Sequence, residues 1–168
     1  MSSFHIAQIN IARALAPIDS PTMADFVARL DELNALAEEA PGFVWRLKAE
    51  GGMPSSYLQP YDDERIVVNM SVWESVEQLK DYVYKTAHAE VLRARKQWFE
   101  EHLANAYLAA WWVPAGHIPG IDEAKKRLAY LDEHGPSQFA FTFKTLQPPD
   151  ESWLSSFDWS IFRPCPAT

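Results

Sequence analysis

The chain contains only one cysteine, Cys165, which lies between two prolines near the end of the sequence. One thiol provides neither a disulfide framework nor a cysteine-based metal site within the chain, and it suits a reducing compartment. Basic residues are also few, since 15 Lys and Arg stand against 23 Asp and Glu and are scattered. A phosphate backbone selects a positive stripe, so the net charge of -8 predicts no nucleic-acid partner.

Long hydrophobic runs are absent as well. No stretch approaches the length that spans a bilayer, and the first residues, MSSFHIAQIN, lack a basic region ahead of an apolar run. The sequence therefore predicts a soluble, cytoplasmic protein with no membrane partner. Apolar and aromatic residues are plentiful, at 48% and 13% of 168 residues, which is enough for a sizeable core in one domain.

Hydrophobic periodicity divides the chain into regular elements. Residues 4–12 predict a strand whose polar face carries Gln8 and Asn10, and a helix follows from Ser20 and Pro21 to the Pro-Gly pair at 41–42. Further strands are expected at 43–49, 65–73 and 106–113. Between the last two, Ser75 and Gln78 form a capping-box signal for one long helix that reaches residue 99.

The resulting order, β-α-β-β-α-β, is that of the ferredoxin-like fold, an α+β arrangement in which an antiparallel sheet carries both helices on one face. The other face needs a cover. Residues 121–131 predict a third helix closed by Gly135 and Pro136, and alternating aromatics at 139–143 predict an extra strand. We expect a domain at 1–146 and an aromatic C-terminal extension at 147–168 that packs on the domain or on a partner.

Several catalytic classes lack their motifs. The sequence has no GxGxxG, no P-loop, no GxSxG elbow and no histidine pair at metal-ligand spacing. It therefore predicts no ordinary nucleotide-binding protein, serine hydrolase or zinc hydrolase, and no protein-bound metal site.

Four segments carry a family resemblance: FHIAQINIA, PGFVWRL, VNMSVWES running into YVYKTAHAEVLRARKQWF, and YLAAWWVPAGHIP. Over residues 4–145 the chain resembles an uncharacterised bacterial domain of unknown function. That domain is grouped with the dimeric α+β barrels, which include antibiotic-biosynthesis monooxygenases and heme-degrading monooxygenases. The resemblance implies a homodimer whose two sheets pack face to face, with a pocket between sheet and helices in each subunit.

The same resemblance bears on His88. The string VYKTAH is similar to the stretch around the heme-ligating histidine of the heme-degrading enzymes, which would make His88 an axial ligand. Those enzymes place a distorting tryptophan earlier on the helix, where this chain has Gln78. Without heme, His88 is the candidate general acid or base, because a neutral imidazole accepts a proton near pH 7. The ordinary alternative is a half-buried histidine bonded to a neighbour.

The candidate ligand-binding residues are strand amides, an anion anchor, aromatic walls and a histidine at the pocket mouth: Gln8, Asn10, Asn69, Arg46, Tyr84, Trp73, Trp111, Trp112 and His117. Trp111 and Trp112 must point to opposite sides of their strand, so at most one of them lines the pocket. Ordinary roles compete with these. They are intrachain amide bonds, a surface ion pair of Arg46, core tryptophans and an exposed turn histidine.

The sequence leaves three functions open. The first is a small-molecule enzyme without a cofactor, monooxygenase-like or an isomerase or cyclase, acting on an apolar, oxygenated metabolite such as a polyketide. The second is a heme-binding or heme-dependent protein with His88 as axial ligand. The third is a non-enzymatic binding module that uses the aromatic residues of 153–162 as its contact element.

Overall fold

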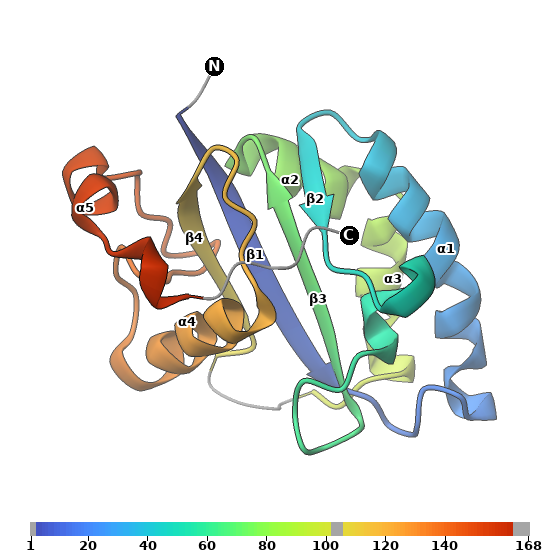
Figure 1. Ribbon diagram of the computed structural model, residues 1–168. Helices are drawn as coiled ribbons and strands as arrows, with labels where there is room; N and C mark the ends of the chain where they lie inside the picture. The colour runs from blue at the N-terminus through green and yellow to red at the C-terminus, as the bar shows by residue number, and fades with distance from the viewer. Residues whose placement is uncertain (1–2, 102–105, 163–168) are drawn as a thin grey trace.

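The computed structural model describes residues 3–101 and 106–162 around a four-stranded antiparallel sheet (Figure 1). Its strands are β1 (Phe4–Arg13), β2 (Phe43–Arg46), β3 (Ile66–Trp73) and β4 (Leu108–Pro114), in the order β2-β3-β1-β4. The α-helices are α1 (Ala24–Glu39), α2 (Val76–Lys85), α3 (His88–Ala94), α4 (Ile121–His134) and α5 (Glu151–Ser156). Element order and sheet topology confirm the ferredoxin-like α+β fold. Cys165 lies outside the described residues.

The two faces of the sheet differ in chemistry because successive strand residues point to opposite sides. Gln8, Asn10 and Asn69 lie on the face that α1, α2 and α3 cover. The opposite face is apolar, with Ile9 and Trp111 fully buried. The sheet thus has a polar and an apolar side, and each is covered by different helices.

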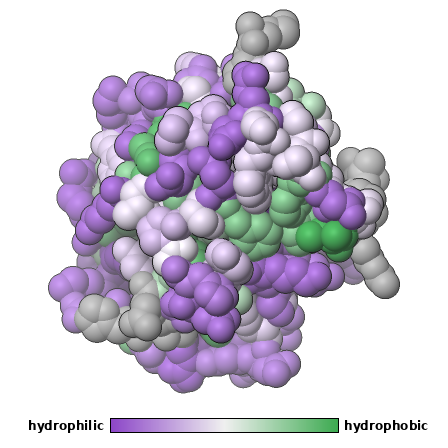
Figure 2. All heavy atoms as spheres, turned by 90° about the vertical axis from the view of Figure 1, so that its left-hand side faces the viewer, coloured by the Kyte–Doolittle hydropathy of each residue, from purple (hydrophilic) through white to green (hydrophobic). Residues whose placement is uncertain are grey.

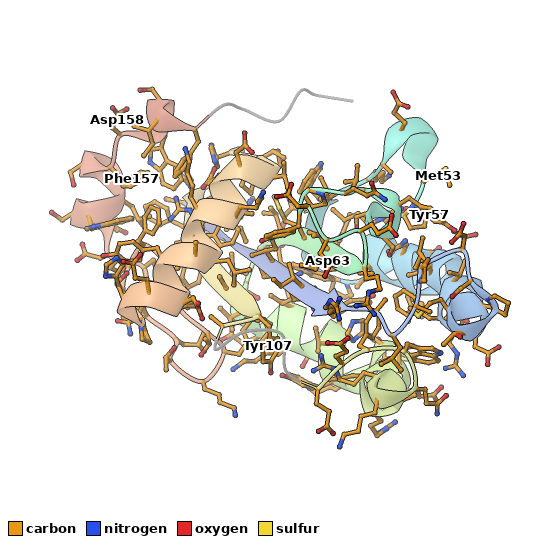
Figure 3. The ribbon with its side chains drawn as sticks, turned by 90° about the horizontal axis from the view of Figure 1, so that it is seen from below. Met53, Tyr57, Asp63, Tyr107, Phe157 and Asp158 are labelled. Atoms are coloured by element: carbon orange, nitrogen blue, oxygen red, sulfur yellow. The ribbon has the colours of Figure 1, made fainter. Side chains whose placement is uncertain are left out.

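Helix α4 covers the apolar face. Its residues Ala124, Leu128 and Leu131 belong to the same core cluster as Ile9 and Trp111. Figures 1 and 3 show α4 on the other side of the sheet from α2 and α3. The face that the resemblance assigns to a dimer interface is therefore buried within one chain, and a homodimer, which stays a prediction, would need another surface.

The long helix expected over 75–99 is wrong in its second half. It begins as expected, since the Ser75 hydroxyl accepts the Gln78 N–H at 3.2 Å, but α2 ends before Thr86, which has extended backbone. Thr86 Oγ1 donates to the Tyr82 carbonyl at 2.6 Å and accepts the His88 N–H at 3.3 Å. These side-chain bonds compete with the helical pattern, so His88 begins a second helix.

The expected strand at 139–143 does not form. Phe141 makes one isolated antiparallel bridge with Ala110, and the chain then turns where the Thr145 N–H donates to the Thr142 carbonyl at 3.1 Å. The side chain of Thr145 accepts the Thr142 N–H, so the threonines fold this segment into a local turn. The segment passes around the β4 edge of the sheet, from the α4 side to the other side.

The C-terminal residues pack on the same chain. Leu154 of α5 is 2% exposed and Phe162 is 5% exposed, whereas Ile161 stays exposed. Figure 2 views the side on which α5 lies and shows a small apolar area surrounded by hydrophilic residues. The domain boundary at residue 146 stays a prediction. Within the described ranges, no helix is long and apolar enough to cross a membrane.

Candidate functional site

A cavity of about 310 Å³ lies between the polar face of the sheet and the helices α1, α2 and α3. Its floor comes from β1 and β3, and α1 contributes an apolar wall that includes Leu30 and Leu33. Asn69 is exposed although β3 is an inner strand, so solvent reaches the floor. The volume lies at the lower end of the range of small-molecule sites, roughly 300–1,000 Å³.

Polar side chains on the floor form a connected network. Gln8 Nε2 donates to Asn69 Oδ1 and to Ser71 Oγ, both at 2.9 Å, and Trp73 Nε1 donates to Ser71 Oγ at 2.9 Å. These bonds use the acceptors of Asn69 and Ser71 and leave the Asn69 amide N–H groups and the Ser71 O–H as donors. The Asn10 amide has no hydrogen-bond partner among the described residues. The floor therefore offers unused donors to a ligand.

His88 lines the same cavity, and its hydrogen bond fixes its tautomer. Nδ1 lies 3.3 Å from the carbonyl oxygen of Val83, and a carbonyl only accepts, so the proton is on Nδ1. Nε2 then keeps its lone pair and has no bond in the described part of the chain. Burial lowers the pKa of His88, and the Val83 bond opposes that shift. The imidazole is therefore neutral at neutral pH and available as a base or a ligand.

An aromatic stack orders the histidine. The Trp73 and Tyr82 rings stack with centroids 5.2 Å apart, and the Tyr82 and His88 rings are tilted at the same separation. Tyr82 OH donates to the Leu33 carbonyl at 2.9 Å, and burial raises the pKa of Tyr82 to about 12. Tyr82 therefore stays neutral. Sequence reasoning missed it, although it follows buried Leu79 by three residues and so shares the inward face of α2.

Arg46 reaches the cavity because β2 contains a bulge. The register shift between Phe43 and Trp45 places Phe43 opposite Trp73 and Arg46 opposite Ser71, so both point to the cavity side. In a strand without a bulge, Phe43 and Arg46 would point to different faces. The Arg46 side chain is only 13% exposed. It lines the cavity and also forms an ion pair with Glu38.

The charge of Arg46 is shared with a surface cluster. Its Nε donates to Glu38 Oε1 at 2.9 Å, and Lys48 Nζ lies 3.1 Å from the same oxygen. The terminal nitrogens of Arg46 have no hydrogen-bond partner among the described residues. At the other end of the cavity the Arg95 guanidinium lies over the Tyr107 ring at 5.6 Å, and Figure 3 shows Tyr107 on the α2 side of the sheet.

Three expected residues lie outside the cavity. Trp111 is on the opposite face, where its Nε1 donates to Glu123 Oε1 at 3.1 Å, and His117 Nε2 lies 2.8 Å from Glu123 Oε2. Trp112 is on the cavity side of the sheet, but its Nε1 donates to the Gln147 carbonyl at 2.8 Å and its ring packs on Phe141. Residues of the segment after α4 therefore cover the Trp112 ring, which is not in the described lining of the cavity.

The other expected residues converge on the cavity. Its described lining includes His88, Gln8, Asn10, Asn69, Arg46, Trp73 and Tyr84, the last 54% exposed at the rim. The segment around the β4 edge adds Phe143 to the lining. No carboxylate belongs to the described lining, and no cluster in the described ranges offers three metal-binding side chains.

On the opposite face, Trp111, His117, Glu123 and Arg127 form a buried charge cluster. Arg127 Nε donates to Glu123 Oε1 at 3.0 Å, and both side chains are 0% exposed. Five aromatic rings surround the guanidinium, with centroids 4.4–5.4 Å from its central carbon: Trp111, Phe139, Phe157, Trp159 and Phe162. Burial lowers the pKa of Arg127 to about 10, against the attraction of Glu123. This cluster fastens α4 and the C-terminal rings to the sheet.

Comparison with known proteins gives a family without an activity. The model of the family described as domain of unknown function (DUF3291) matches residues 5–156, which extends past residue 145 and through α5. No curated protein matches. A crystal structure of a protein of unknown function from Nitrosomonas europaea is similar at 12% identity and a TM-score of 0.43, covering 70% of this chain and 97% of that one. That of a putative antibiotic biosynthesis monooxygenase from Chloroflexus aurantiacus J-10-fl is similar at 17% identity and a TM-score of 0.36, covering 70% and 98%.

Proposed function

We propose, for a chain that belongs to the DUF3291 family of unknown function, that the cavity binds a small, largely apolar, oxygen-bearing molecule and that His88 acts on it as a general base. One observation carries the proposal. His88 is neutral and keeps an unpartnered Nε2 lone pair while lining a cavity of about 310 Å³.

The surrounding groups suit proton abstraction beside a carbonyl. Nε2 would take the proton, and negative charge would then develop on the ligand oxygen. The unused amide N–H groups of Asn10 and Asn69 are donors that stabilise such a charge. The Trp73 ring and the leucines of α1 would hold the apolar body. This chemistry is common to isomerases, cyclases and cofactor-independent monooxygenase-like enzymes, and the resemblance favours the last.

The test uses an apolar ketone of known chemistry, 2-tetralone, and follows deuterium exchange at its α-carbon by NMR. The wild type should accelerate exchange, and His88→Gln should lose about 10²-fold or more of that acceleration, the usual share of a general base. His134→Gln is the matched control, because His134 is an exposed histidine at the end of α4. Equal exchange rates in wild type and His88→Gln would refute the role of His88. Binding without any exchange would favour a binding module.

Heme binding is the second candidate, favoured by the same unpartnered Nε2, which is the donor that an axial histidine supplies. Arg46 and Arg95 would pair with propionates, and the iron would supply redox chemistry. The heme-degrading enzymes that the chain resembles have a distorting tryptophan where this chain has Gln78, whose side chain bonds to Ser75 and is not in the described lining of the cavity. Hemin titration decides between the candidates. A Soret shift that His88→Ala abolishes would establish heme binding, and its absence would remove the heme hypothesis.

The binding-module hypothesis has less support. It needs free aromatic side chains in the tail, but Phe157, Trp159 and Phe162 surround Arg127 of the same chain. Truncation before residue 147 should therefore destabilise the fold rather than abolish partner binding alone.

A further inference from the structure

We propose that the cavity selects ligands that carry a carboxylate, and that Arg46 binds this group. The ligand class is then an apolar carboxylic acid, held with its charged end at the β2 side of the floor. This inference rests on the proposed ligand binding, but it does not require catalysis by His88.

The β-sheet register places Arg46 within a row of polar residues. Arg46 pairs with Ser71 across β2 and β3, and Ser71 pairs with Gln8 across β3 and β1. Paired residues on neighbouring strands have Cα atoms about 4.5–5.5 Å apart. One carboxylate can therefore accept from Arg46 with one oxygen and from the Ser71 hydroxyl with the other. The hydroxyl is free to donate because Gln8 and Trp73 use only its acceptor capacity.

The charges around Arg46 leave it able to bind an anion. Glu38 is the one carboxylate bonded to Arg46 among the described residues, and it also pairs with Lys48. The hydrogen bond with Lys48 lowers the pKa of Glu38 most, and Arg46 lowers it further, so that carboxylate is ionised. Two cations share one anion, and the cluster keeps a positive charge.

Glu38 also fixes the direction of the guanidinium. It accepts from Nε at 2.9 Å and is not among the cavity-lining residues, so it holds the Nε edge of Arg46 outside the cavity. The terminal nitrogens keep their N–H groups, which can donate charge-assisted hydrogen bonds to the carboxylate oxygen that Ser71 does not bind. The geometry is that of a pre-oriented anion anchor.

The rest of the cavity agrees with this class of ligand. The chain carries a net charge of -8, yet the described lining contains two arginines and no Asp or Glu. Beyond the polar row the lining is apolar, with Trp73, Leu30 and Leu33. Arg95 is the other cation, but it lies over Tyr107 at the opposite end, and it provides a matched control.

The test compares two probes that are small enough for the cavity and differ in the charge at one end, 4-phenylbutyric acid and its methyl ester. Isothermal titration calorimetry measures the dissociation constant of each probe. Wild-type protein should bind the acid about tenfold or more tightly than the ester, the ratio expected from a charge-assisted hydrogen bond. Arg46→Gln should bring the affinity for the acid down to that for the ester. Arg46→Lys should keep part of the preference, and Arg95→Gln should keep all of it.

The outcomes separate this inference from the proposed function. A circular-dichroism spectrum and a urea midpoint like those of the wild type show that Arg46→Gln is folded, so loss of the acid preference in that variant supports the inference. Equal binding of acid and ester by the wild type would overturn the inference, although apolar ligand binding would stand. An acid preference that survives Arg46→Gln, or that is lost in Arg95→Gln, would overturn it in the same way. If neither probe binds folded wild-type protein, the proposed apolar ligand site is itself wrong, and the inference falls with it.

Discussion

Replacement of Arg127 by methionine should destabilise the protein strongly, because it leaves a buried carboxylate without its cation. Glu123 is 0% exposed, and after Arg127→Met its remaining partners would be Trp111 and His117. Methionine keeps the apolar stem of the side chain, so the loss of packing is small. The change therefore removes the guanidinium, with its charge and the hydrogen bond that Nη1 donates to the Phe139 carbonyl at 2.7 Å, and leaves the stem in place.

The magnitude follows from the burial of both partners. Breaking a fully buried ion pair by removing one partner costs about 3–5 kcal/mol. Loss of the contacts between the guanidinium and the five surrounding rings adds to this cost. The burial that lowers the pKa of Arg127 to about 10 also means that the pair as a whole stabilises the fold little. The double variant Glu123→Gln with Arg127→Met should therefore recover to within about 1–2 kcal/mol of the wild type, since the amide still accepts from Trp111.

Urea unfolding followed by tryptophan fluorescence measures these differences. With a slope of about 2 kcal/mol per molar, the single variant should shift the midpoint down by roughly 2 M, with the slope unchanged. A loss below about 1 kcal/mol for Arg127→Met would refute the reasoning. The reasoning would also be refuted if the double variant lost as much free energy of unfolding as the two single variants lose together, because Glu123 and Arg127 would then not be energetically coupled.

Two further predictions concern pH and backbone conformation. Burial lowers the folded-state pKa of His88 below 6.5, so below about pH 6.5 the unfolded chain binds more protons than the folded chain. The free energy of unfolding of the wild type should therefore fall relative to that of His88→Gln as the pH drops. A difference between the two proteins that does not change with pH would contradict the buried, neutral histidine. Gly42 has φ +80°, and a Cβ there would lie 2.0 Å from Gln78 Oε1, whereas Gly51 has φ +66° and open space. By urea unfolding, Gly51→Ala should cost about 1–2 kcal/mol for its left-handed backbone. Gly42→Ala should cost up to about 1 kcal/mol more, because the Gln78 amide must move away from its bond with Ser75. Equal losses would show that the contact is unimportant.

Local patterns predicted much of the fold and part of the cavity floor. Alternation along residues 4–12 put Gln8 and Asn10 on one face, and the structure pairs Asn10 with Asn69 across β1 and β3. The capping signal at Ser75 also marked the start of α2 correctly. Both features depend on residues that are close in sequence, so they can be predicted from one sequence alone.

Single-residue irregularities limited the rest of the prediction. The bulge in β2 sends Phe43 and Arg46 to the same side, and one hydroxyl, on Thr86, ends α2 and places His88 at the start of α3. Neither has a strong local signal, yet each decides which way a cavity residue points. The position of Trp112 depended on the segment around the β4 edge, a contact between distant parts of the chain.

The cover that α4 provides for the apolar sheet face makes the burial of this core a property of the single chain. A cover supplied by a second molecule is present only above the dissociation constant of the pair, so stability then changes with dilution. A cover joined to β4 by the short connection 115–120 acts at a fixed, high effective concentration instead. The cover over this face of the sheet is therefore insensitive to dilution.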